Sequence, residues 1–162
     1  MGAFDLNHTI VKKLRLLGST ASAETDTGFD LPSDAVIRNA FLYVQTAEAS
    51  ETVDVGILST ATTGDADGIL DGVSMATAGW VFPTATHSAT GKKWDSTTWG
   101  AYMRHFVAGT NSTIPGVFAM KPSGYQVTSA HGKSVSYTGS STSSTWVADL
   151  YLVFDHFPAM AE

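Results

Sequence analysis

The sequence contains no cysteine and few charged residues. Without cysteine, neither disulfides nor thiolate chemistry can contribute to the fold or to a site. Charged residues make up 15% of the 162 residues, compared with about 25% in typical globular chains. The formal net charge of −6 is opposite to the basic surface that neutralises phosphates, so we expect no nucleic-acid partner.

Long apolar runs are also missing. No run approaches the roughly 18 apolar residues of a membrane span, so we expect no membrane association. No apolar run follows the N-terminal basic residues, so we expect no secretory signal. The chain has no G-x-S-x-G motif, no glycine-rich phosphate loop and no histidine pair at zinc-ligand spacing. These absences predict a protein that is not an enzyme and binds no cofactor.

What the sequence does contain is short alternating segments separated by turn residues. We expect strands over residues 8–17, 35–46, 53–57, 101–107, 114–120, 125–129, 134–138 and 145–157. No long amphipathic helix is evident. This pattern predicts an all-β fold, an antiparallel β-sandwich or jelly roll of about eight strands with an N-terminal arm.

Two of the expected strands are apolar on both faces. In residues 35–46 both alternating sets are largely apolar, which predicts a strand covered by a second sheet and by a neighbour or loop. The expected strand over residues 145–157 is longer and also apolar on both faces, so we expect it to be central in its sheet.

The expected loops complete this outline. The small, polar residues 19–30 are expected to form a loop or an extended arm, and residues 60–68 a loop. Residues 69–82 are expected to begin with one helical turn and to end as a strand. Residues 125–129 and 134–138 are joined by the turn sequence AHGK and are expected to pair as a hairpin.

The expected domain organisation has one boundary. Residues 1–30 form an N-terminal arm, or a first strand with a loop, and residues 31–162 form the sandwich domain. Lys12, Lys13 and Arg15 carry three of the nine basic charges in this first segment. Two interpretations are open: they form the solvent side of one segment, or they dock to an acidic partner.

The sequence TGDADGILDG holds three aspartates, Asp65, Asp67 and Asp71, with glycine beside each. Oxygen ligands at alternate positions and a glycine for the bend are what a calcium loop requires. However, Ile69 occupies the next ligand position of an EF-hand and no bidentate glutamate follows. A turn stabilised by Asp and Gly is the alternative, and no metal ion is expected.

Trp94 and Trp99 lie in the polar segment KKWDSTTWG. They are candidates for a subunit interface, because aromatic side chains are enriched there. Packing under a long loop is an equal alternative, and stacking on a sugar ring is a third.

The segment LPSDAVIRNAFLYVQTAEASETVDVGIL, followed by GDADGILDGVSMATAG, resembles small structural proteins of tailed bacteriophages. These are head decoration, or capsid-stabilising (cement), proteins. The similarity covers about a third of the chain, and its motifs are structural rather than catalytic. Tail and spike proteins share such motifs.

The resemblance implies a β-sandwich or jelly roll, often trimeric, seated on the outer capsid surface of a virion. It implies a non-enzymatic protein with the major capsid protein and further copies of itself as partners. It also suggests that residues 1–30 reach a neighbouring subunit, so that their deletion would leave a folded protein unable to coat capsids. The alternatives are a carbohydrate-binding or tail/spike β-module of a virion and, third, a hydrolase with an unrecognised site.

Overall fold

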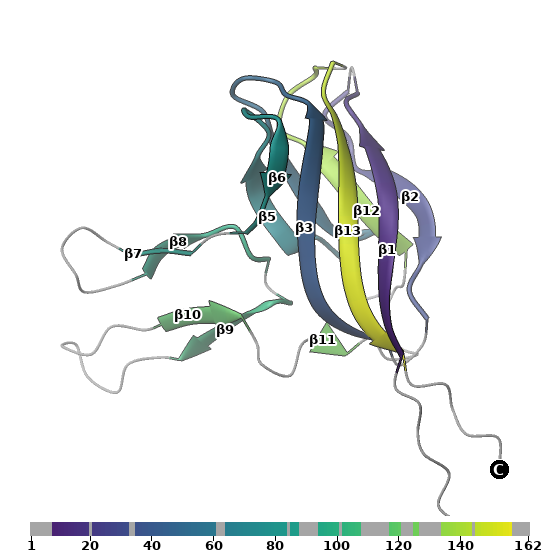
Figure 1. Ribbon diagram of the computed structural model, residues 1–162, viewed down its shortest axis with the longest axis vertical. Coiled ribbons are helices and arrows are strands. Elements are labelled where there is room, and N and C mark those ends of the chain that lie inside the picture. Colours follow the sequence, from purple (N-terminus) through teal and green to yellow (C-terminus); the bar gives the residue numbers. More distant parts are fainter. Residues whose placement is uncertain are drawn as a thin grey trace, which may run out of the picture.

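The fold is all-β, a sandwich of two antiparallel sheets, as the sequence predicts (Figure 1). The computed structural model describes residues 8–19, 21–32, 35–60, 64–83, 85–87, 94–100, 102–107, 117–120, 125–126, 134–143 and 145–156. None of these residues belongs to a helix that is long and apolar enough to cross a membrane.

Eight strands form the body of the sandwich. In the first sheet they are β1 (His8–Leu17), β13 (Val147–His156), β3 (Val36–Thr46) and β6 (Gly79–Val81). In the second sheet they are β2 (Thr25–Asp30), β12 (Ser134–Gly139), β4 (Thr52–Ile57) and β5 (Asp65–Ser74). The chain passes between the two sheets at nearly every connection, which is the topology of a jelly roll and confirms that prediction.

Five shorter strands make up the rest of the regular structure in the described residues. They are β7 (Ala85–His87), β8 (Trp94–Thr97), β9 (Arg104–Val107), β10 (Val117–Met120) and β11 (Tyr125–Gln126). Strands β7 and β8 pair with each other, as do β9 and β10, and Figure 1 shows both hairpins to one side of the sandwich. Strand β11 pairs with β3 and extends the first sheet.

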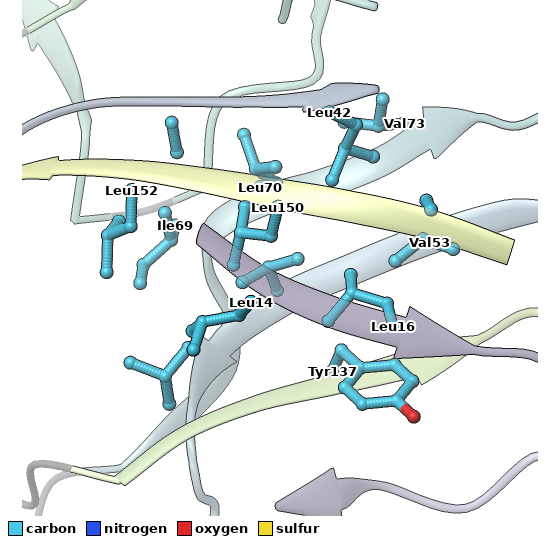
Figure 2. Packing of buried hydrophobic residues seen from close by; sticks show 14 of the residues in the cluster. Leu14, Leu16, Leu42, Val53, Ile69, Leu70, Val73, Tyr137, Leu150 and Leu152 are labelled. Atoms are coloured by element: carbon cyan, nitrogen blue, oxygen red, sulfur yellow. The ribbon is translucent and has the colours of Figure 1, made fainter. Parts of the chain in front are cut away.

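The core lies between the sheets because successive side chains of a strand point to opposite faces. From Trp146, just before β13, every second residue to Phe154 is buried, with exposed fractions of 0–2%. Leucines of β1 and β3 meet them from the same sheet, and Val53, Ile69 and Val73 from the other (Figure 2). As expected, β13 is central, pairing with β1 on one side and β3 on the other.

One close contact between β4 and β5 explains a glycine of the core. A Cβ atom on Gly56 would lie 2.0 Å from the carbonyl oxygen of Asp65. That separation is far below any allowed contact, so only glycine permits the two backbones to approach this closely.

Residues 25–30 form strand β2, not the expected loop. The segment looked like a loop because TDTGFD is short and polar. In the structure Thr25, Thr27 and Phe29 are half-buried and alternate with exposed residues, as in an edge strand with one solvated face. Residues 8–30 therefore contribute strands to both sheets, and no flexible arm is seen in their described part. The domain boundary at residue 31 stays a prediction.

Two further expectations were wrong. Strand β5 includes residues 65–68, which were expected to form a loop. It also includes the residues expected to form a helical turn, because burial of Ile69, Leu70 and Val73 favours an extended chain. The described residues show no pairing between 125–126 and 134–138, where a hairpin was expected, and residues 127–129 lie outside the described part. Strand β11 pairs with β3 whereas β12 pairs with β2 and β4, in the other sheet. Alternation predicts a strand but does not specify its partner.

Candidate interaction surface

The outer face of the first sheet carries a group of aromatic side chains. We call it the aromatic cluster; its members are Phe41, Tyr43, Trp80, Phe82 and Tyr151. They come from three neighbouring strands, β3, β6 and β13, and from the residue after β6. The register brings them together, because Tyr151 pairs with Phe41 and Trp80 pairs with Tyr43.

The rings of the cluster pack closely on one another. Phe41 and Tyr151 stack with an interplanar angle of 4° and centroids 5.5 Å apart. Trp80 lies edge-on to Tyr43 at 4.9 Å and also contacts Phe41 at 5.7 Å and Tyr151 at 5.1 Å. Each such pair contributes about 0.5–1.5 kcal/mol beyond area burial. The cluster is therefore ordered by its own contacts.

Despite this packing, the cluster is open to solvent. The exposed fractions are 37% for Tyr43, 54% for Trp80 and 58% for Phe82. Val11, on the outer face of β1, is 58% exposed. Contiguous apolar surface of this kind, as opposed to scattered apolar residues, marks interaction sites on soluble proteins. The outer face of the first sheet is therefore our candidate interaction surface.

A buried carboxylate, that of Asp149, lies beside the cluster. It accepts hydrogen bonds from the Lys13 ammonium at 2.8 Å and from the Gln45 amide at 2.6 Å, both on Oδ2. Burial raises the pKa of Asp149, but the hydrogen bonds from Lys13 and Gln45 outweigh it and the net pKa is lowered. The bond to Asp149 in turn raises the pKa of Lys13. Both hydrogen bonds to Asp149 are on Oδ2, and the buried Oδ1 of Asp149 has no hydrogen-bond partner among the described residues.

A second buried carboxylate, Asp155, lies on the same strand. It accepts hydrogen bonds from the Thr9 hydroxyl and from Nε of Arg38, each at 2.6 Å. The Asp155 side chain is 7% exposed, compared with 36% for Arg38. Both aspartates of β13 are thus held by donors of the neighbouring strands, and they fix β1 and β3 to β13.

The basic residues predicted to act together are separated by the alternation of β1. Lys13 and Arg15 point to the outer face with the aromatic cluster. Lys12 points the other way, and its ammonium lies 4.9 Å from the centre of the Phe29 ring on β2. The structure thus brings Lys13 and Arg15 to the candidate surface and places Lys12 between the two sheets at their edge.

The two tryptophan candidates lie elsewhere. Trp99 is half-buried, pairs with Leu70 as an isolated bridge and packs against the core. This position agrees with packing under a loop, although an interface role for Trp99 stays a prediction. Trp94 begins strand β8, and its side chain is outside the part of the chain that the structure describes.

The predicted calcium-loop candidates Asp65, Asp67 and Asp71 all lie in β5. Across from them on β4, Asp54 accepts a hydrogen bond from the Gly72 amide at 2.7 Å. Burial raises the pKa of Asp54, and the charges of Asp71 and Asp67 raise it further. Within the described ranges, no three His, Asp or Glu side chains are placed to hold a metal ion. The aspartates here repel one another across a strand pair.

Sequence reasoning missed the aromatic cluster, although one signal pointed to it. Both faces of residues 35–46 were recognised as apolar, and a cover was expected on each. The second sheet covers the inner face, with Ile37, Ala40, Leu42 and Val44 buried. On the outer face Tyr43 remains exposed, so the described residues leave that side partly uncovered. Trp80 could not be assigned to this cluster from the sequence, because its position there depends on the pairing of β6 with β3.

Comparisons with known proteins give one similar structure. No protein-family model matches the sequence, and no curated protein matches it. This chain is similar to a chain of a solved structure described as "Cyanophage Pam1 capsid asymmetric unit". The similarity covers 98% of this chain and 91% of that chain. The identity is 15% and the TM-score 0.47. At these values the similarity does not assign a function.

Proposed function

We propose that this chain is a non-enzymatic structural protein of a bacteriophage virion. In this role it binds the outside of the capsid shell, with the major capsid protein as partner, and stabilises the head. The resemblance of residues 31–81 to head decoration proteins supports the role. The observation that carries it is the exposed aromatic cluster on the outer face of the first sheet.

The surroundings of the cluster favour a protein partner. Next to the rings, the carboxylate of Asp149 is already bonded to Lys13 and Gln45. Interface centres are typically rich in aromatic residues and poor in unpaired charge. Many identical sites on a closed shell would give avidity without tight binding at any single site.

The test is sedimentation of the purified protein with shells assembled from the major capsid protein of the same phage. We expect the wild-type protein to pellet with shells and Trp80→Ala to stay in the supernatant. Thr60→Ala is the control, because Thr60 is exposed in the turn after β4 and lies outside the first sheet. Binding by Trp80→Ala at wild-type level, or equal loss in both variants, would count against docking through the cluster.

The self-association implied by the family resemblance is part of the proposal. We expect a homotrimer, in keeping with a seat where three capsid subunits meet. Multi-angle light scattering of the purified protein measures this directly. A monomer at all accessible concentrations would contradict the trimer.

A second candidate function is a carbohydrate-binding module of a capsid, tail or spike. The exposed rings of Trp80 and Phe82 favour it, because aromatic rings can stack on sugars. The bonds of Lys13 and Gln45 to Asp149 weigh against it, because they engage these donors, and the unpartnered Oδ1 of Asp149 is buried, whereas sugar hydroxyls need accessible donors and acceptors. A glycan array, run with and without a calcium chelator, separates the two functions: specific glycan binding would favour the module.

A further inference from the structure

Strand β1 forms a long edge of the first sheet. Its ten residues pair with β13 in an unbroken register, from His8 with His156 to Leu17 with Val147. Among the strands that the structure describes, none pairs with its other side. Such an edge presents a row of backbone N–H and C=O groups to a further strand.

The hydrogen bonds at the end of β1 identify which residues face outward. The Tyr137 hydroxyl contacts both the N–H and the C=O of Leu17, at 3.3 and 3.2 Å. The next amide, that of Gly18, instead bonds the Trp146 carbonyl on the β13 side. Because backbone groups alternate between the two sides of a strand, those of Val11, Lys13 and Arg15 point to the open side.

The other edges of the sandwich are short, irregular or covered. Strands β6 and β11 have three and two residues. Strand β2 has a register shift against β12 and a glycine at positive φ, Gly28. The edge of β5 is covered by the chain around Trp99, through bonds from Gly100 to Ile69 and from Tyr102 to Gly68. In the described part of the sandwich, β1 is thus the long, regular and open edge.

The charge of β1 selects the partner. Lys12, Lys13 and Arg15 stand within four positions, in a chain of net charge −6. A second copy of β1 would bring like charges face to face, which destabilises strand pairing. Lysine on an edge strand is a common protection against such self-pairing. An extended segment carrying carboxylates would instead form an opposite-charge pair with Arg15.

We propose that the open edge of β1 binds an extended acidic segment of another polypeptide, which adds to the sheet as a further strand. Backbone hydrogen bonds to Val11, Lys13 and Arg15 provide the binding, and the charges provide the selectivity. Lys13 is already bonded to Asp149, so Arg15 is the main cation for the added strand. This inference is independent of the virion role, because it can be tested without capsids.

The probe is a capped peptide of alternating valine and glutamate, ten residues long like β1. Amide hydrogen exchange measured by NMR on the full-length protein gives the readout. In the free protein we expect slow exchange at the even-numbered amides of β1, which face β13, and fast exchange at Val11, Lys13 and Arg15. Saturating peptide should slow exchange at these three amides specifically.

Two controls separate strand addition from simple charge attraction. A peptide of the same sequence, N-methylated at every residue, keeps the carboxylates but has no N–H donor, and we expect no protection with it. Arg15→Gln should weaken binding about two- to fivefold, the value of one cross-strand charge pair. Thr60→Glu, which lowers the net charge by the same amount at an exposed turn, should leave affinity unchanged.

Three results would overturn the inference. The first is absence of binding by the acidic peptide. The second is equal binding of the N-methylated peptide, which would mean charge attraction alone. The third is slow exchange at Val11, Lys13 and Arg15 in the free protein, which would mean that the edge is already occupied.

Discussion

The ammonium of Lys13 lies 2.8 Å from the carboxylate of Asp149, across the pairing of β1 with β13. The two side chains differ in exposure, with 55% for Lys13 and 2% for Asp149. Asp149 is therefore a nearly buried charge whose cation comes from the edge strand. The pair connects the stability of the first sheet to the strand that we propose as a docking edge.

Lys13→Met tests this connection through its pH dependence. The folded-state pKa of Asp149 is lowered, so its contribution to stability is present above the ordinary carboxyl pKa of 3.8 and is lost as the pH falls through the folded value. At pH 7 we expect Lys13→Met to melt below the wild type. The difference should shrink as the pH falls through the lowered pKa of Asp149, because the carboxyl then becomes protonated in both proteins. Arg15→Gln, which removes a more distant cation, should lower the melting temperature less. An equal, pH-independent lowering of the melting temperature in both variants would contradict this account.

Asp54→Asn should stabilise the protein at neutral pH. Burial, with the charges of Asp71 and Asp67, raises the folded-state pKa of Asp54, so this group lowers stability as the pH rises through its titration range. The amide oxygen of asparagine can still accept the hydrogen bond from Gly72. We expect a gain of about 0.5–2 kcal/mol in chemical denaturation at pH 7. The gain should vanish below the ordinary pKa of 3.8, and a pH-independent gain would point to another cause.

Trp80→Ala and Trp146→Ala should separate surface binding from core stability. Trp146 is 1% exposed in the core, and its loss should cost about 3–5 kcal/mol of unfolding free energy. Trp80 is 54% exposed, so we expect its loss to cost about 2 kcal/mol, near the lower end of the sum for its three ring contacts. Urea denaturation followed by circular dichroism measures both. A loss at Trp80 as large as that at Trp146 would show that the cluster serves the fold rather than a partner.

Deletion of residues 1–30 should abolish folding. The deletion removes β1 and β2, and with them Leu14 and Leu16 of the core and the donor to Asp149. We expect the truncated protein to be insoluble, or to lose cooperative thermal unfolding and near-ultraviolet circular dichroism. This reverses the expectation drawn from the sequence. A folded, cooperative product would show that β1 and β2 are dispensable.

The sequence alone predicted the fold class and the central strand. Alternation of apolar and polar residues is a local property, so β3, β4 and β13 could be located from it. The apolar character of both faces of β13 also predicted its central position. The expectations drawn from missing apolar runs and missing catalytic motifs are local in the same sense, because each depends on residues near one another in sequence.

Strand partners and surface neighbours were decided by the tertiary structure. Strand β2 looked like a loop because its stabilising partner, β12, lies more than 100 residues away along the chain. Lys12 and Lys13 are adjacent in sequence, yet the pleat sends them to opposite faces. The aromatic cluster exists only because β6 crosses back to pair with β3, bringing Trp80 to Tyr43. Periodicity locates strands whose own side chains alternate, whereas long-range pairing decides the remaining strands and which side chains form a surface.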